Sequence, residues 1–312
     1  MVIVPSHDIK RRPYAAGQSS CVAYEYAATR GAREPEPEPG TAANWMRADI
    51  EQAVSIRVPK AERILYKLTF YEPHGKRQAA RSPGPLPTAV STTRVVWTIA
   101  LALYAGNKVE GDFVETGVFN GGTAITMLRV LDRLQSDKQF WACDSFRGLP
   151  IPTAGDNKCS KSPTSGLKTI GCATGRGGSY ASTKRNFMRN LNRYQVGTAR
   201  MHVVEGWFNE TLPPAKLHSI SFLRLDGDLY ASTMDALVAL YPLVTPGGLV
   251  YVDDYGSFGG CKAAVDEYRK RRGIKSRLMS IREDPSLNTR LFGFSQKDQR
   301  SDVFEAVWWV AE

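Results

Sequence analysis

The sequence predicts an α/β protein built on a doubly wound, mostly parallel β-sheet. Two observations carry this prediction. From residue 111 onward, short apolar and β-branched runs alternate with segments of helical periodicity. In addition, runs 220–225 and 249–252 are each followed at once by paired aspartates. Such runs are typical of buried parallel strands, and ligands bind at the carboxyl ends of those strands.

The strands and helices of this region follow in a regular order. The predicted strands are 111–118, 139–144, 201–204, 220–225 and 249–252, then an antiparallel closing pair at 275–281 and 303–310. The predicted helices are 123–134, 180–194, 233–243 and 261–272. The first helix carries Ile125, Leu128 and Leu131 on one face, and a Pro-Gly-Gly segment ends the third.

The remainder of the chain divides by composition. Residues 1–50 contain alternating Glu and Pro and are expected to form a disordered extension, with a targeting segment as an open alternative. Residues 51–110 form a helical N-terminal segment, with helices at about 51–71 and 90–105. Residues 111–312 form the main domain. Within it, residues 152–179 are rich in Gly, Ser, Thr and Lys, which predicts a mobile basic insertion.

Composition restricts the class of protein. With 42% hydrophobic and 23% charged residues, the chain is typical of a soluble globular protein, and no apolar run is long enough to span a membrane. Five scattered cysteines without metal-ligand spacing indicate reduced thiols and a cytoplasmic location. A homo-oligomer remains open.

The net charge of +10 is concentrated in residues 151–200, which carry nine Lys or Arg and one acid. Few aromatic residues accompany these cations and no nucleic-acid-binding motif is visible, so no nucleic-acid partner is expected. The segment is either a solvated basic flank or a region that attracts an anionic small substrate such as a sugar phosphate.

The paired aspartates are the strongest chemical signal. Asp226 and Asp228 follow one predicted strand, and Asp253 and Asp254 follow the next. Carboxylates that converge at one sheet edge repel each other unless a hard cation or a shared proton resolves the conflict. Oxygen ligands without a His/Cys cluster favour Mg²⁺ or Ca²⁺ over zinc. Helix capping would explain one carboxylate in each loop but not two in both.

Three further segments suggest a cofactor beside this site. Glu115 lies two residues before Gly117, in a turn where a ligand can approach the backbone and where an acid can hold an amino group. The spacing of the glycines is not the dinucleotide pattern. Asp144 ends the second strand and is placed to accept from ribose hydroxyls, or to cap a helix. Trp207 could flank an adenine, or be a core aromatic.

Together these segments resemble the family of S-adenosylmethionine-dependent sugar O-methyltransferases typified by macrocin O-methyltransferase (TylF-type). The resemblance covers roughly residues 95–312 in family order. The matching segments are Gly111–Val118, Asp144–Pro150, Glu205–Phe208, Thr211–Pro213, Leu223–Leu237, Pro246–Gly248 and Val252–Tyr255. The basic insertion departs from the family, which leaves the acceptor open.

The resemblance implies a class I methyltransferase fold, S-adenosylmethionine as cofactor and a divalent metal, with Mg²⁺ the first choice. It implies that Asp228 is the general base. The metal ligands would be Asp226, Asp253 and Asp254. The cofactor-binding residues would be Glu115, Gly117, Asp144, Ser145, Glu205, Gly206 and Trp207.

The expected activity is methylation of a hydroxyl on a sugar or glycosylated small molecule. Two alternatives are a catechol or phenol O-methyltransferase of the same fold, and a catalytically silent module that binds a partner through the basic segment. The four intact aspartates speak against the silent module.

Overall fold

The computed structural model describes residues 50, 52–55, 57–70, 85–156, 177–284, 286–287 and 304–312. The predicted N-terminal extension, apart from residue 50, and residues 157–176 of the predicted basic insertion lie outside the described residues. Within the described ranges, no helix is long and apolar enough to cross a membrane.

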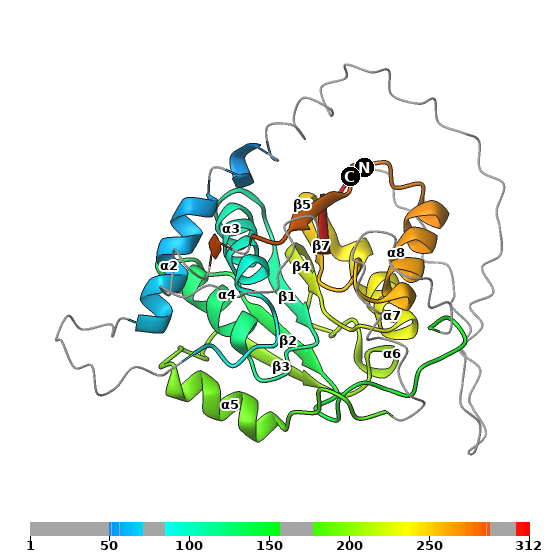
Figure 1. The fold of residues 1–312 in the computed structure, drawn as a ribbon, viewed down its shortest axis with the longest axis horizontal. Helices are drawn as coiled ribbons and strands as arrows, with labels where there is room; N and C mark the ends of the chain where they lie inside the picture. The colour runs from blue at the N-terminus through cyan, green and yellow to red at the C-terminus, as the bar shows by residue number, and fades with distance from the viewer. Residues whose placement is uncertain are drawn as a thin grey trace. The chain divides into compact units, whose positions relative to one another are not determined.

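The core of the protein is a seven-stranded sheet with the order β3-β2-β1-β4-β5-β7-β6 (Figure 1). Strands β1 to β5 run parallel to one another, and β7 pairs antiparallel with both β5 and β6. The predicted doubly wound sheet with an antiparallel closing pair is therefore confirmed. The strands are β1 Asp112–Thr116, β2 Phe140–Asp144, β3 Met201–Glu205, β4 Ile220–Leu225, β5 Val244–Val252, β6 Met279–Arg282 and β7 Phe304–Val310.

The helices begin and end where local chemistry favours it. The Ser91 hydroxyl accepts from the backbone N–H of Arg94 at the start of α3, and Thr183 caps α5 in the same way. Gly273 ends α8 in a left-handed conformation. The helices are α2 Val58–Phe70, α3 Thr92–Lys108, α4 Gly122–Arg133, α5 Lys184–Arg193, α6 Phe208–Thr211, α7 Tyr230–Leu240 and α8 Gly259–Arg272.

Several element boundaries differ from the prediction, among them α5, which begins at Lys184 and not at residue 180, and β6, which begins at Met279 and not at residue 275. Helix α7 begins three residues earlier than predicted, and residues Tyr241–Leu243 form a 3-10 turn. Strand β5 begins at Val244 and not at residue 249, so it includes the Pro-Gly-Gly segment that is predicted to end the preceding helix. The register between β4 and β5 shifts after Ile220, so this segment is an irregular strand start.

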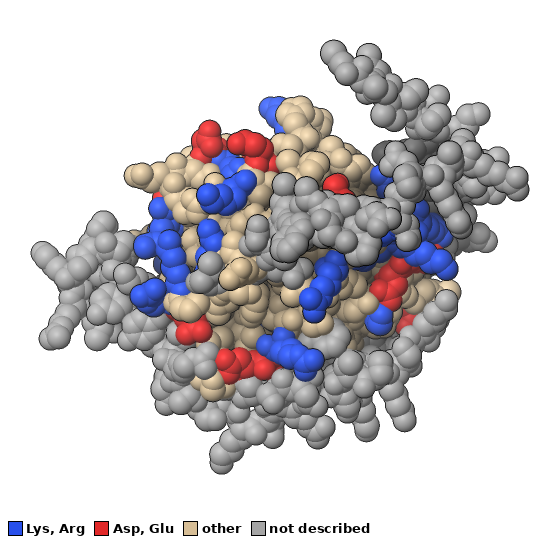
Figure 2. Space-filling view, turned by 90° about the horizontal axis from the view of Figure 1, so that it is seen from above, with Lys and Arg blue, Asp and Glu red and all other residues tan. Residues whose placement is uncertain are grey.

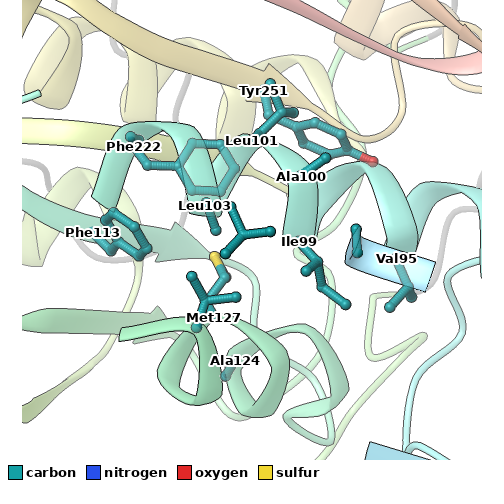
Figure 3. Close-up of a cluster of buried hydrophobic side chains, with 14 of the residues drawn as sticks. Val95, Ile99, Ala100, Leu101, Leu103, Phe113, Ala124, Met127, Phe222 and Tyr251 are labelled. Carbon is teal, nitrogen blue, oxygen red and sulfur yellow. The ribbon is translucent and has the colours of Figure 1, made fainter. Parts of the chain in front are cut away.

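Helices cover both faces of the sheet. Side chains alternate along each strand, so each strand packs against the helices on both faces. Phe113 and Phe222 point to the face covered by α3 and α4, where their rings meet edge to face with centroids 5.6 Å apart (Figure 3). Leu223 and Val250 point to the other face and pack against α7 and α8. The central strands are therefore buried on both sides, which explains their continuous apolar runs.

Positively and negatively charged side chains are interspersed on the surface of the described residues. Figure 2 shows Lys and Arg side chains in several separate groups on the face it presents, with Asp and Glu side chains between them. Helix α5 contributes exposed arginines at Arg185, Arg189 and Arg193, one turn apart.

Gly117 follows the end of β1 and lies against the loop after β4. Its backbone is left-handed, with φ +84°, and a Cβ atom there would lie 1.7 Å from the carbonyl oxygen of Asp226. The N–H of Asp226 donates to the carbonyl of Thr116 at 2.9 Å. Glycine is therefore required because the aspartate-bearing loop lies directly against this turn.

We expect Gly117→Ala to lower the free energy of unfolding by about 3 to 5 kcal/mol, from left-handed strain and from the overlap with Asp226. Gly247 is the matched control, because its φ is +83° and a Cβ atom there would meet nothing within 4 Å. Gly247→Ala should cost only the strain, about 1 to 2 kcal/mol. Urea unfolding measures both, and equal losses would contradict the close approach.

Candidate active site

The predicted site residues meet at one edge of the sheet, where the parallel strands end. Asp144 is the register partner of Glu205 across β2 and β3. Thr116 pairs with Leu225 and Leu225 with Val252, so the loops after β1, β4 and β5 start side by side. This edge is where ligands bind in open α/β sheets.

Three aspartates form a compact carboxylate group. Asp226, Asp228 and Asp254 each offer an oxygen, and these oxygens lie within 4.8 Å of one another. The backbone N–H of Asp228 donates to Oδ2 of Asp254 at 3.3 Å. Three negative charges at this spacing require either protons or a cation.

The pKa values of these carboxyls follow from their surroundings. Burial, and then the charges of Asp226 and Asp253, raise the pKa of Asp228 to about 8. Burial and the charge of Asp228 raise the pKa of Asp254 well above its usual range, and burial and Asp253 raise that of Asp226. A divalent cation would satisfy the oxygen-only donor set and remove the repulsion.

Asp253 lies in a different environment. Its Oδ1 accepts from Nη2 of Arg224 and from the Tyr251 hydroxyl, both at 2.7 Å, and its Oδ2 accepts from Nη1 of Arg94. Burial acts to raise its pKa, but the guanidinium groups of Arg94 and Arg224 hold the pKa of Asp253 below its usual range. The carboxylate group thus contains Asp228, the expected base, whereas Asp253, an expected metal ligand, is paired with arginines.

Arg224 is a fully buried guanidinium in the central strand β4. Its Nη1 donates to Oε1 of Glu115 at 3.1 Å and to Oδ2 of Asp226 at 2.7 Å, and its Nη2 donates to Asp253 at 2.7 Å. The guanidinium also lies over the Tyr251 ring, 5.1 Å from its centroid. One side chain therefore connects the end of β1 with the aspartates after β4 and β5.

Arg94 is the second buried cation and comes from the first turn of α3. Besides Asp253, it contacts Glu305 at 2.7 Å and Glu283 at 3.5 Å. It therefore links α3 to the carboxyl end of β5 and to the antiparallel pair. Sequence reasoning missed both arginines. Arg224 gave a signal, since it is a charged residue between two leucines in a buried strand, and Arg94 gave none.

Glu115 is fully buried and only half satisfied. Its Oε1 accepts from the Thr123 hydroxyl at 2.5 Å and from Arg224. Its Oε2 has no hydrogen-bond donor within the described part of the chain. Burial raises the pKa of Glu115 to about 7, although Arg224 opposes this. A buried acceptor without a donor is a position where a ligand amino group would be stabilised.

Asp144 holds the turns at the ends of β1 and β2. Its Oδ2 accepts from the N–H groups of Val118 and Phe119, at 2.8 and 3.1 Å, and its Oδ1 accepts from that of Phe146 at 2.7 Å. Burial raises its pKa, and these backbone hydrogen bonds oppose the increase. Its structural role is thus the capping of two loops.

The other predicted cofactor residues follow the ends of β2 and β3. The Ser145 hydroxyl donates to the carbonyl of Gly148 at 3.1 Å, and the Gly206 N–H donates to that of Asp144 at 3.0 Å. Glu205 is exposed and pairs with Lys184 at 3.2 Å. Trp207 is half-buried and immediately precedes α6. Their contact with a cofactor stays a prediction.

Comparison with known proteins is consistent with this arrangement. Residues 94–286 match the Macrocin-O-methyltransferase (TylF) family. The chain belongs to this family. The resemblance inferred from the sequence is thereby confirmed.

Curated relatives match just over half of the chain. Over 184 residues, 57% of this chain, it is 39% identical to demethyldecarbamoylnovobiocin O-methyltransferase of Streptomyces niveus. Over 174 residues, 55% of this chain, it is 36% identical to mycinamicin III 3''-O-methyltransferase of Micromonospora griseorubida. In each case the match spans 66% of the relative, slightly less than two thirds of its length.

Solved structures share the fold. The O-methyltransferase NovP superposes with a TM-score of 0.59 at 29% identity, over 82% of this chain and 98% of that one. The calicheamicin methyltransferase CalS11 gives a TM-score of 0.51 at 18% identity, over 81% and 91% of the two chains, and supports the fold alone. The expected methyltransferase fold is confirmed.

We expect Arg224→Met to lower the free energy of unfolding by about 3 to 5 kcal/mol, because it leaves the buried Glu115 and Asp253 and the half-buried Asp226 without their shared cation. The matched control is Arg271→Met, which removes an exposed arginine paired with Glu267 one turn away on α8. That change should stay within about 1 kcal/mol of the parent. Chemical denaturation measures both, and similar losses would show that the buried cluster does not depend on Arg224.

Proposed function

We propose that this protein is an S-adenosylmethionine-dependent O-methyltransferase that methylates a hydroxyl of a sugar on a glycosylated small molecule. The observation that carries the proposal is the group of Asp226, Asp228 and Asp254 at the sheet edge of a chain of the TylF family. The group lies one side chain, Arg224, away from the half-satisfied Glu115.

The choice of a sugar acceptor is supported by the relatives. A third relative, from Streptomyces olivaceus, is 37% identical over 175 residues and is named for 4'-O-methylation of a rhamnosyl tetracenomycin. The other two are named for O-methylation of a novobiocin precursor and of mycinamicin III. These names favour a glycoside over a simple catechol or phenol.

The cofactor would bind across the ends of β1 and β2. S-adenosylmethionine supplies an electrophilic methyl group on a positively charged sulfur, so transfer requires alignment rather than acid catalysis. The free Oε2 of Glu115 is suited to the ammonium of the methionine part. Asp144 would meet the ribose, and the Trp207 ring would flank the adenine.

A divalent cation, Mg²⁺ first, would be held by Asp226 and Asp254. These two belong both to the metal ligands that the sequence resemblance implies and to the carboxylate group. The cation would lower the pKa of the acceptor hydroxyl. Asp253 could act as a third ligand only in competition with Arg94 and Arg224.

Asp228 is proposed as the general base. It shares the carboxylate group, and its left-handed backbone, with φ +57°, places it beside Asp254. With a cation on Asp226 and Asp254, the repulsion that raises its pKa is relieved and its ionised form can accept the hydroxyl proton.

The proposal is tested by transfer of a labelled methyl group from S-adenosylmethionine to a panel of glycosides and to catechol. We expect transfer to glycosides that EDTA abolishes and that added Mg²⁺ restores. Transfer to catechol alone would favour the phenol alternative. Calorimetric binding of the cofactor without transfer to any acceptor would favour the silent module. A rate unchanged by EDTA would contradict the metal proposal.

We expect Asp228→Asn to lower kcat by about 10²- to 10⁴-fold, because the amide cannot accept the proton. Asparagine tolerates the left-handed backbone, so the loss reports chemistry rather than folding. Asp266→Asn on α8 is the control, since that side chain is half exposed and pairs with Lys262. Full turnover in Asp228→Asn would exclude the base role.

Titration with Mg²⁺ distinguishes whether Asp228 acts as the general base or as a metal ligand. If Asp228 is the base, Asp228→Asn should bind Mg²⁺ with affinity close to that of the parent. If Mg²⁺ affinity falls in Asp228→Asn but not in Asp253→Asn, Asp228 is a ligand instead.

A further inference from the structure

Tyr180 is an exposed aromatic residue at the carboxyl edge of the sheet. It lies just before α5, and 51% of its surface is exposed. Its ring meets that of Phe119 edge to face, with centroids 6.1 Å apart and planes at 86°. Phe119 belongs to the turn after β1, whose backbone Asp144 holds. The Tyr180 ring is therefore backed by the turn proposed to bind the cofactor.

Backbone strain is concentrated around this edge. Six described non-glycine residues have a positive φ. Gln135 and Gln195 occur where α4 and α5 end, which is an ordinary way to end a helix. The other four, all in loops at the carboxyl edge, are Phe119, Phe146, Tyr180 and Asp228.

Left-handed backbone costs an L-residue about 1 to 2 kcal/mol, and such residues persist where function requires them. Phe146 is buried, and its packing offsets this cost. Tyr180 has no comparable burial, and its φ is +56°. Among the described residues, the packing of the exposed ring thus rests mainly on its contact with Phe119, which is little burial for a costly backbone conformation.

The charges of the carboxylate group act on the phenol of Tyr180. Burial of part of the side chain, then the negative charges of Asp228, Asp254 and Asp226, raise the pKa of Tyr180. The phenol therefore stays protonated and can donate a hydrogen bond. The ring of Tyr180 contacts Phe119, on the cofactor side, and its phenol is influenced by the charges of the aspartates on the cation side.

We propose that Tyr180, supported by Phe119, is the platform on which the acceptor's sugar ring stacks, with the phenol donating to a sugar oxygen. An exposed aromatic face suits the apolar C–H face of a pyranose, and one polar group at its end can fix the orientation of the sugar. This inference rests on the proposed function, because it assigns the acceptor subsite of the same site. Met188, an exposed apolar side chain on α5, provides a control.

The test uses the full-length protein with Mg²⁺ and S-adenosylhomocysteine. Binding of a panel of methyl glycosides, including methyl α-L-rhamnopyranoside, is measured by saturation-transfer NMR. The variants are Tyr180→Gly, Tyr180→Phe and Met188→Ala. Affinity for the best-bound glycoside should fall about tenfold in Tyr180→Gly, fall less in Tyr180→Phe, and stay unchanged in Met188→Ala.

Thermal unfolding supplies the decisive second readout. Because glycine relieves the left-handed strain, Tyr180→Gly should unfold at an equal or higher temperature than the parent while it binds glycoside more weakly. A lower unfolding temperature with unchanged glycoside affinity would show a structural role and overturn the inference. Failure of the parent to bind any glycoside would also overturn it.

The two proposals fail separately. Cofactor binding and methyl transfer by the parent test the proposed function without reference to Tyr180. If the parent transfers methyl groups to a glycoside and Tyr180→Gly does so with an unchanged KM, the platform is wrong and the proposed function stands.

Discussion

The buried guanidinium of Arg224 is the interaction on which the rest of the site depends. Glu115, Asp226 and Asp253 come from three adjacent strands, and all three accept hydrogen bonds from this one side chain. An uncompensated buried carboxylate costs several kcal/mol, so these acids could not lie together at the sheet edge without an internal cation. Arg224 occupies the strand between those of its partners, and the sheet register therefore fixes where each carboxylate lies.

Arg94 and Arg224 also distinguish the aspartates, because they balance the negative charge of Asp253 but not fully that of the other three. Asp253 receives both Arg94 and Arg224 and has a lowered pKa. The pKa values of Asp226, Asp228 and Asp254 are raised, because their burial and mutual repulsion exceed the compensation available. An electrostatic deficit of this kind is what a divalent cation removes. The four aspartates thus separate into Asp253, whose charge is balanced by both arginines, and three whose charge is not fully balanced, which is typical of functional sites.

The sheet, its order of elements and the edge that bears the site could be predicted, because alternating patterns and strand-end acids are local in the sequence. The grouping of side chains could not. Arg94 contacts Asp253 across 159 positions, and no local pattern announces such a contact. The partition between Asp228 and Asp253 depends on which oxygens the arginines occupy, which requires the packed structure. The sequence explains Gly117 by the approach of a ligand to the backbone. In the structure, the atom nearest to an added Cβ at this position is the carbonyl oxygen of Asp226.

The place of each residue in the fold, on a buried strand or in a loop, indicates how such a site can change its acceptor. The carboxylates and Arg224 lie on or directly after buried strands, so their positions are fixed by the register and by packing on both sheet faces. Tyr180 follows the insertion and is held by a strained backbone and one ring contact. A substitution of the exposed Tyr180 removes little buried surface, whereas a change at Arg224 affects three acids at once. Under the two proposals, the chemistry is carried by residues of the sheet and the acceptor choice by a loop, so the acceptor can vary while the chemistry stays the same.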